Sequence, residues 1–441
     1  MKLKRVSALL ASTALLTLVV ACQTKESTQA GATPAASGSA QPSGPINIDY
    51  WGGWTGPDLE TMKGLVGKFN AEQKKIHVEF TSMQWTPLFT KFLTEMKGGQ
   101  PPDVLAMHPF EIGQFAEMGV LDAKALESAK LTKADYSDFA WGGTMYKGKQ
   151  YAVPLDVHMH GLFFNKEMLE KAGVAAAPKT GDELIAFAQK LTLDKNGKHP
   201  NESGFDDNNI TQYGLGFNMN HHAFYQFYAL LSQQGENPFK EDMKKLDFDE
   251  QKAAKAFGFL EDLIFKYKVV PKGEKSPVDD FISGKVAMIV DGPWQMPKLE
   301  TSSVKWGSAP YPKVFDKQVA WGAAEVLTFP VNEKANASEK AAAVEFVKWL
   351  DKNSGEWANS GQLPSSNSGM EVAKKMPGRE AFVSSLSNAV LLPAHPKSAQ
   401  LFSSTAPSPI LTAAQDAVLN NKNPLEIVKQ LKKDINAILA E

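Results

Sequence analysis

The chain has 441 residues, 47 basic and 49 acidic side chains, and a hydrophobic content of 43%. This composition is typical of a globular protein, and because a single core stops growing at about 250–300 residues, the length favours two lobes. The near-balance of charge, without any lysine-rich block, gives no reason to expect a nucleic acid partner.

The chain opens with a pattern that predicts an export signal. Lys2, Lys4 and Arg5 form a basic start, and the apolar run 6–20 follows. This run is shorter than the roughly 20 residues that a membrane span needs. It ends in "LVVAC", whose Cys22 is the single cysteine of the sequence. The fold therefore cannot depend on a disulfide within the chain.

The stretch that ends at Cys22 resembles the lipobox of bacterial lipoproteins. The resemblance implies removal of residues 1–21 as a signal peptide and lipid attachment at Cys22; the alternative is an ordinary signal peptide with an incidental cysteine. Residues 22–45 contain no large apolar side chain, which predicts a flexible, lipidated tether with a span of roughly 25 Å. We expect an extracytoplasmic protein that meets the membrane through this anchor alone.

From residue 46 onward, strand-like and helix-like segments alternate. The patterns predict strands at 46–51, 76–83 and 102–107 and helices at 58–73 and 86–99. Strands that alternate with helices favour parallel pairing through right-handed crossovers. In such sheets a ligand binds beyond the carboxyl ends of the strands. These ends carry a set of aromatic and polar side chains: Trp51, Trp54, Trp85, His108, Phe110 and Glu111.

The alternation continues through the second half of the chain. It predicts strands at 213–217, 285–290, 305–312 and 325–331, helices at 222–235, 249–267 and 338–353, and a mostly helical tail from about residue 377.

Five blocks stand in a characteristic order: "GGQPPDVLAMHPFEIGQFAEMGVLDA", "YKGKQYAVPLDVHMHGLFFNKEMLEKAG", "FISGKVAMIVDGPWQM", "AEVLTFPVNEKANASEKAAAVEFVKWL" and "QLPSSNSG". Together they resemble the extracellular solute-binding proteins of sugar ABC importers, family 1, the group that includes maltose-binding protein. The resemblance covers about residues 46–370.

The resemblance implies an α/β fold of the two-lobed periplasmic-binding-protein type (class II), in which each lobe is a mainly parallel sheet flanked by helices and a hinge joins the lobes. By this analogy the N-terminal lobe comprises 46–156 plus 322–372, and the C-terminal lobe comprises 157–321 plus 373–441. The hinge crossings are expected near residues 155–158, 310–322 and 363–368.

A sugar site needs flat rings for the C–H faces of the sugar and polar groups for its hydroxyls. Trp294 follows the strand-breaking pair Gly292-Pro293, and the family carries a sugar-stacking tryptophan at the matching place. The other aromatic candidates are Trp51, Trp54, Trp85 and Trp321, each with a structural role as its alternative. Core or other structural positions are expected for Trp141, Trp306, Trp349 and Trp357.

The polar candidates are His108, Glu111, Asp156 and His158. The first two follow the third strand, where the family has polar positions. Asp156 and His158 alternate along a crossing strand and so share one face. An ordinary surface or hinge hydrogen bond is the alternative for each of the four. Weaker candidates are His160, His221, His222, Gln362 and His395.

Three rival functions are weighed against sugar binding. A metal importer component would use converging histidines, but no histidine-rich loop is present. A glycosidase would need two carboxylates at a set separation, and no recognised catalytic block appears. The same fold with a polyamine, metal or peptide ligand is the main alternative. We therefore expect a monomeric, non-enzymatic sugar-binding protein without cofactor or metal, which delivers its ligand to an ABC permease.

Overall fold

The computed structural model describes residues 44–441, which form one compact unit. The predicted signal peptide (1–21) and Cys22 lie outside the described residues, and so does almost all of the predicted tether. Among the described residues, no helix combines the length and the apolar character of a membrane span.

The first sheet contains five strands in the order β2-β1-β3-β15-β6. Their bounds are β1 Ile46–Gly52, β2 Ile76–Ser82, β3 Val104–Met107, β6 Val153–Pro154 and β15 Val326–Thr328. The strand β1 pairs in parallel with β2 and β3, whereas β15 runs antiparallel to β3 and β6. All strands except β15 therefore point the same way, as the sequence predicts.

Helices cover both faces of the first sheet. They are α1 Asp58–Glu72, α2 Trp85–Gly98, α3 Pro109–Glu117, α4 Ala123–Ala129, α12 Ala337–Lys352 and α13 Ser354–Trp357, whereas α5 Asp138–Gly142 packs against the segment 156–159. The apolar spacing of α1 buries Met62, Val66 and Phe69 against the sheet. Short elements complete this part: η1 Lys133–Asp135, η3 Ala358–Ser360 and the hairpin of β4 Met145–Tyr146 with β5 Lys149–Gln150.

The second sheet has the order β11-β12-β8-β13. Its strands are β8 Gly161–Asn165, β11 Gly216–Phe217, β12 Met288–Asp291 and β13 Trp306–Pro310. Only β8 runs against the others. The predicted strand 213–217 is shorter than expected, because Tyr213 forms only an isolated bridge with Val286.

Helices of the second half pack around this sheet. The longer ones are α7 Gly181–Leu191, α8 His221–Gln233, α9 Glu250–Phe265, α17 Pro409–Val418 and α18 Pro424–Ala440. The shorter elements are α6 Lys166–Lys171, α10 Pro277–Ile282, η2 Pro293–Gln295, α11 Met296–Glu300, α14 Asn367–Ala373, α15 Glu380–Ser385, η4 Leu386–Asn388, α16 Ser398–Leu401 and the pair β9 Leu193–Asp194 with β10 Ile210–Gln212.

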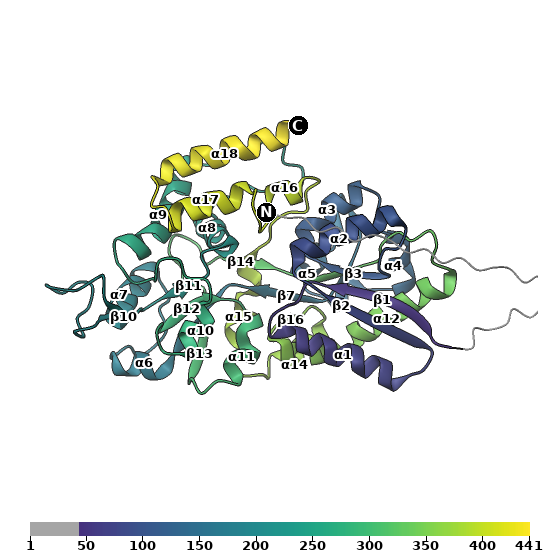
Figure 1. The fold of residues 1–441 in the computed structure, drawn as a ribbon, viewed down its shortest axis with the longest axis horizontal. Helices are drawn as coiled ribbons and strands as arrows, with labels where there is room; N and C mark the ends of the chain where they lie inside the picture. Colours follow the sequence, from purple (N-terminus) through teal and green to yellow (C-terminus); the bar gives the residue numbers. More distant parts are fainter. Residues whose placement is uncertain (1–43) are drawn as a thin grey trace, which may run out of the picture. The chain divides into compact units, whose positions relative to one another are not determined.

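The largest hydrophobic core lies where α8, α9, α17 and α18 pack together (Figure 1). Phe227 of α8 stacks on Phe257 of α9, with ring centroids 3.8 Å apart and planes 10° from parallel. The predicted helical tail is thus confirmed, and its role is to complete this core.

A small sheet, here called the crossing sheet, lies where the chain passes between the two larger sheets (Figure 1). Its order is β16-β7-β14-β17, with β7 Asp156–Met159, β14 Ala320–Ala323, β16 Leu363–Pro364 and β17 Ala389–Val390. β7 leads from β6 to β8, and β14 leads from β13 to β15. Three of its strands fall at or beside the predicted crossings; the lobe boundaries drawn through them stay predictions.

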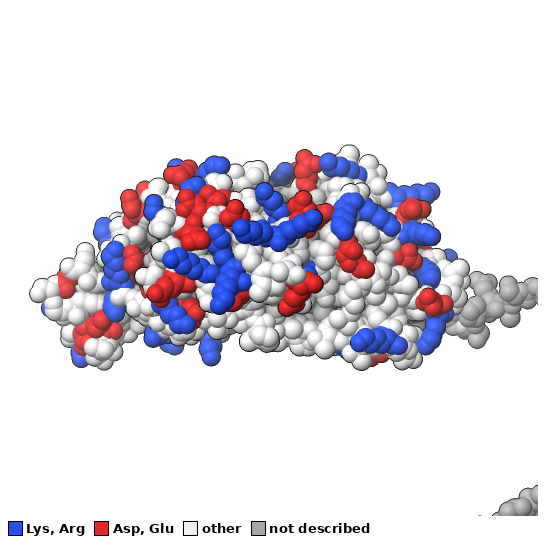
Figure 2. All heavy atoms as spheres, turned by 90° about the horizontal axis from the view of Figure 1, so that it is seen from above, with Lys and Arg blue, Asp and Glu red and all other residues white. Residues whose placement is uncertain are grey.

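The surface carries acidic and basic side chains side by side. Figure 2 shows them interspersed over the face in view. This pattern agrees with the near-neutral composition and favours a solute recognised by local chemistry over one attracted by a broad field.

Candidate functional site

The end of β1 is shaped by indole rings that lie against glycine backbone. A β-carbon on Gly53 would come within 1.9 Å of the Trp85 indole, and one on Gly52 within 2.2 Å of the Trp54 indole. Both positions therefore need glycine. The pair "GG" between two tryptophans serves close packing of rings on the turn.

Trp54 lies in a group of edge-to-face aromatic rings. It is 2% exposed, and its ring centroid lies 5.7 Å from that of Trp85 and 5.4 Å from that of Trp357. Trp85 is the first residue of α2, not part of the preceding loop. Its ring lies 4.3 Å from His108, which in turn stacks on Phe110.

Glu111 and His108 cap α3. The carboxylate of Glu111 accepts a hydrogen bond from the backbone N–H of His108 at 2.9 Å and lies 3.2 Å from His108 Nδ1. This capping box fixes both side chains at the end of β3. Both side chains therefore have a structural role as the cap of α3. A contact with a solute stays a prediction for each of them.

Asp156 is the most completely enclosed polar side chain of the crossing. Its Oδ2 accepts a hydrogen bond from Trp357 Nε1 at 2.6 Å, and its Oδ1 accepts one from the backbone N–H of Glu325 at 2.9 Å. Burial works to raise the pKa of Asp156, but hydrogen bonds with Glu325 and His158 outweigh it and hold the pKa below its usual value. Asp156 thus stays a carboxylate.

Glu325 faces the opposite electrostatic situation. It is 4% exposed, and burial together with the nearby Asp156 raises its pKa well above the ordinary value. His158 lies between the two carboxyl groups, with Nδ1 3.4 Å from an oxygen of each. The crossing therefore holds two acids and an imidazole away from water.

A group of rings, here called the indole–histidine cluster, follows along the crossing: His158, His160, His222, Tyr225, Trp294 and Trp321. Trp321 stacks on Tyr225 at 4.1 Å with planes 5° from parallel. His160 Nε2 lies 3.0 Å from His222 Nδ1, and Trp294 stands edge-on to His158 at 5.4 Å. Flat apolar faces and hydrogen-bonding nitrogens thus alternate within one group.

Burial keeps His160 and His222 of this cluster in the neutral form. Burial and the neighbouring imidazoles lower the pKa of His160 to about 3 and that of His222 well below its usual value. Burial also lowers the pKa of His221 to about 4. Neutral imidazole both donates and accepts, which suits hydroxyl groups.

Trp294 is positioned by the end of β12. A β-carbon on Gly292 would lie 2.0 Å from its indole, so this ring also lies on glycine backbone. Asp291 precedes it and accepts hydrogen bonds from the Gly292 N–H at 2.8 Å and from Gln295 Nε2 at 3.2 Å. Burial raises the pKa of Asp291 to about 7.

A polar cavity of about 250 Å³ opens beside Trp294. His222, Asp291 and Gln295 line it from the second half of the chain, and Pro57 lines it from the turn before α1. It thus joins residues that follow the strand ends of both larger sheets.

Eight of the nine predicted substrate-contacting residues belong to one chain of contacts through the crossing: Trp54, Trp85, His108, Glu111, Asp156, His158, Trp294 and Trp321. Trp51 lies apart. It is 6% exposed within the core beside α2, where Lys91 Nζ lies 3.9 Å from its ring centroid.

Sequence reasoning missed several members of the site. Glu325, Asp291 and Tyr225 were not predicted, whereas Trp357 has the structural position expected for it: it is fully buried and donates a hydrogen bond to Asp156. A carboxylate inside the apolar stretch "GAAEVLTF" was the signal that could have found Glu325. Tyr225 follows His221 by one helical turn, and Asp291 ends an apolar strand next to Trp294.

The weaker candidates divide between site and scaffold. His160 and His222 belong to the cluster, and His221 stacks beside His222 at 4.4 Å. His395 Nε2 lies 3.0 Å from the backbone carbonyl of Met243, in contact with the scaffold. Gln362 is buried beside β16.

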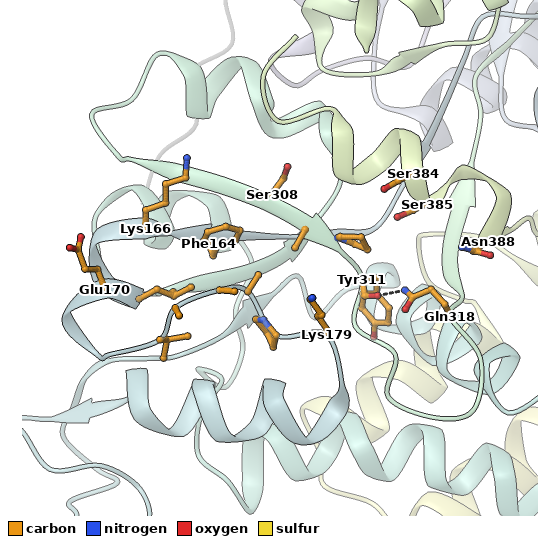
Figure 3. A pocket seen from close by; sticks show the side chains of 18 of the residues that line it. Phe164, Lys166, Glu170, Lys179, Ser308, Tyr311, Gln318, Ser384, Ser385 and Asn388 are labelled. Carbon is orange, nitrogen blue, oxygen red and sulfur yellow. Dashed lines mark hydrogen bonds between the residues drawn. The ribbon is translucent and has the colours of Figure 1, made fainter. Parts of the chain in front are cut away.

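The larger cavity, of about 1090 Å³, lies elsewhere (Figure 3). It runs along β8 and the edge strand β13, with Phe164, Ser308 and Tyr311 among its lining residues. No residue of the indole–histidine cluster lines it. The cluster has the converging rings and polar groups that a solute site needs, so we place the candidate site there despite the smaller cavity.

Two α/β sheets with a crossing sheet and an aromatic, hydrogen-bonding cluster between them define a two-lobed solute-binding protein. Residues 53–356 match the family described as bacterial extracellular solute-binding protein, and the chain belongs to this family.

Known relatives are similar in sequence at a moderate level. The maltotriose-binding protein of Pyrococcus abyssi is 24% identical over 313 residues, which cover 69% of this chain and 62% of the relative. The matched part is thus less than two thirds of that relative's length. The maltodextrin-binding protein MdxE of Bacillus subtilis is 27% identical over 57% of each chain.

Solved structures show the same fold. An ABC substrate-binding protein from Listeria monocytogenes, in complex with cycloalternan, superposes with a TM-score of 0.76 at 21% identity, over 90% of this chain and 99% of that one. A maltose/maltodextrin-binding domain from Bdellovibrio bacteriovorus, bound to maltotriose, gives the same TM-score and identity over 90% and 100%. The expected two-lobed α/β fold is therefore confirmed.

Proposed function

We propose that this protein is the extracytoplasmic substrate-binding component of a sugar ABC importer. It captures a mono- or oligosaccharide between its lobes and delivers it to the membrane permease. The observation that carries the proposal is the indole–histidine cluster, where Trp294 and Trp321 meet the imidazoles of His160 and His222 at the crossing. Indole faces pack on sugar C–H groups, and neutral imidazoles bond to hydroxyls.

The names of similar proteins point to α-glucans as the first ligands to test. Relatives and structural neighbours are named for maltotriose, maltodextrin or cycloalternan. In this chain the rings of the cluster contact one another, so we propose that a sugar enters when the lobes part and is held when they close on it. The closed state is favoured by its additional ligand contacts.

The test is a thermal-shift screen of residues 44–441 against glucose, maltose, maltotriose, longer maltodextrins and cellobiose. A ligand present at a hundredfold its dissociation constant stabilises the native state by about 2.7 kcal/mol, which raises the melting temperature measurably. If none of these sugars, nor a broader saccharide panel, raises the melting temperature, the proposal is wrong.

We further propose that the protein binds without catalysis. The oligosaccharides that raise the melting temperature are then recovered intact after prolonged incubation, as chromatography of the mixture reports. Shorter products would instead indicate a glycosidase.

The anchor and the lobe boundaries belong to the same proposal. Lipid attachment at Cys22 predicts that Cys22→Ala releases the protein from the cell envelope, whereas the unaltered chain remains with the membrane fraction. The hinge is proposed at the three crossings, with lobes 46–156 plus 322–372 and 157–321 plus 373–441.

A further inference from the structure

Asp156, His158 and Glu325, here called the buried trio, bring three metal-ligand atoms together. His158 Nδ1 lies 3.4 Å from Asp156 Oδ1 and 3.4 Å from Glu325 Oε2, and all three atoms lie within 4.8 Å of one another. The three side chains are 5% exposed or less. Side chains with one nitrogen and two oxygen donors converge here from β7 and from the residue just before β15.

The hydrogen bonds of Asp156 leave part of this arrangement unsatisfied. Charge-assisted N–H···O bonds have lengths of about 2.7–2.9 Å, so both 3.4 Å separations are long. Glu325 Oε2 has no hydrogen-bond partner among residues 44–441. An unsatisfied carboxylate oxygen in a buried site is costly, and this one points into the trio.

A bound metal ion accounts for the spacing. Two ligand atoms that each lie about 2.1 Å from a tetrahedral zinc ion are separated by about 3.4 Å. The separations of His158 Nδ1 from the oxygens of Asp156 and Glu325 match this distance between ligand atoms.

The surroundings of the trio also fit a metal site. Metal-binding carboxylates are oriented by hydrogen bonds from outside the first layer of ligands. Asp156 has such bonds, from Trp357 Nε1 to Oδ2 and from the Glu325 backbone N–H to Oδ1. Within the described part of the chain, no lysine or arginine forms an ion pair with Asp156 or Glu325. A dication would compensate the Asp156 carboxylate, for which these residues offer no lysine or arginine partner.

We propose that Asp156, His158 and Glu325 bind a divalent transition-metal ion, with Zn²⁺ as the ion that best suits one imidazole and two carboxylates. The sequence analysis expects no metal, and the rival metal site weighed there used converging histidines. The site proposed here uses one of them. The ion holds the β7 crossing to the segment before β15, so it braces the hinge.

The test measures metal binding directly. The purified chain is stripped with a chelator, dialysed, and titrated with ZnCl₂ and, separately, MnCl₂ by calorimetry, and bound metal is counted by mass spectrometry. We expect one Zn²⁺ per chain. The isosteric variant Glu325→Gln removes one anionic ligand and should weaken Zn²⁺ binding at least tenfold.

Two further variants locate the binding. Glu356→Gln changes an exposed carboxylate outside the trio and should bind Zn²⁺ as the unaltered chain does. His222→Gln removes an imidazole of the indole–histidine cluster and should also leave Zn²⁺ affinity unchanged. Loss of binding in His222→Gln with retention in Glu325→Gln would overturn the proposal, because the ion would then lie among the histidines.

Circular dichroism establishes that each variant is folded. If Glu325→Gln does not fold, His158→Gln provides the same test through another ligand of the trio. Absence of bound Zn²⁺ and Mn²⁺ in the stripped and titrated chain also overturns the proposal. Because no sugar is present in these titrations, their outcome is separate from that of the sugar screen.

Discussion

The helical core around Phe227 and the crossing around Asp156 are both buried, yet they consist of opposite kinds of side chain. In the core, apolar rings from α8 and α9 stack face to face. At the crossing, polar atoms are enclosed, and His160 Nδ1 and Glu325 Oε2 lack partners within residues 44–441. The first region contributes mainly apolar burial, while the second encloses polar atoms that have no partner of their own.

The largest expected effect falls on the helical core. Phe257→Ala removes a fully buried ring and should lower the free energy of unfolding by about 3–5 kcal/mol. Urea denaturation measures the loss. Because α9 contributes no residue to the indole–histidine cluster, the sugar affinity of the folded fraction should not change. A changed affinity would show that the helical core and the candidate site are coupled.

The second prediction concerns the pH dependence of stability through Asp291. Its pKa is about 7 in the folded protein, against an ordinary value of 3.8. The folded state therefore holds a proton that the unfolded state has released, so stability falls as the pH rises from about 4 to 7. The shift corresponds to at most about 4 kcal/mol.

Asp291→Asn removes this titration. In urea denaturation at a series of pH values, the variant should gain stability relative to the unaltered chain as the pH approaches 7. A difference between the two that does not vary with pH would show that Asp291 titrates normally.

The third prediction tests the ring that most directly serves the proposed sugar. Trp294→Ala should weaken binding of the sugar found in the screen by about 1–3 kcal/mol, which is roughly 5- to 150-fold, because a stacking surface is lost. Titration calorimetry measures it. Trp141→Ala is the control, since Trp141 pairs with Tyr136 outside the cluster. Equal affinity in the folded Trp294→Ala variant would remove this indole from the site.

The smallest effect on binding is expected at Trp51. This ring packs beside α2 with Lys91, on a different group of residues from Trp54. Trp51→Phe should leave sugar affinity within about twofold and reduce stability by roughly 1 kcal/mol. A tenfold loss of affinity in calorimetry would return Trp51 to the site.

The sequence predicted local secondary structure well, but it predicted contacts between side chains distant in the chain poorly. The first three strands and the helices between them follow from apolar periodicity, which is a local property. The hydrogen bond from the Glu325 backbone to Asp156 joins positions 169 residues apart, and no periodicity reports such a pair. Trp51 and Trp54 look alike in sequence, but only the strand's alternation and the neighbouring helix decide which core each ring enters.

The start of α2 illustrates the same limit. The pattern placed Trp85 in the loop after β2, whereas it is the first residue of the helix. Helix boundaries depend on contacts at the first turn, and here the indole lies against Gly53 from another strand end. The shortened β11 has a similar origin, because its partner β12 pairs with only two of its residues.

Three indoles of this protein lie against the backbone of Gly52, Gly53 and Gly292, where a β-carbon would clash with them. The close approach of the glycine backbone limits the positions that each indole can take. Folding therefore fixes the place of these rings in advance, and any side chain added at the three glycines would displace an indole and disturb the packing at the strand ends.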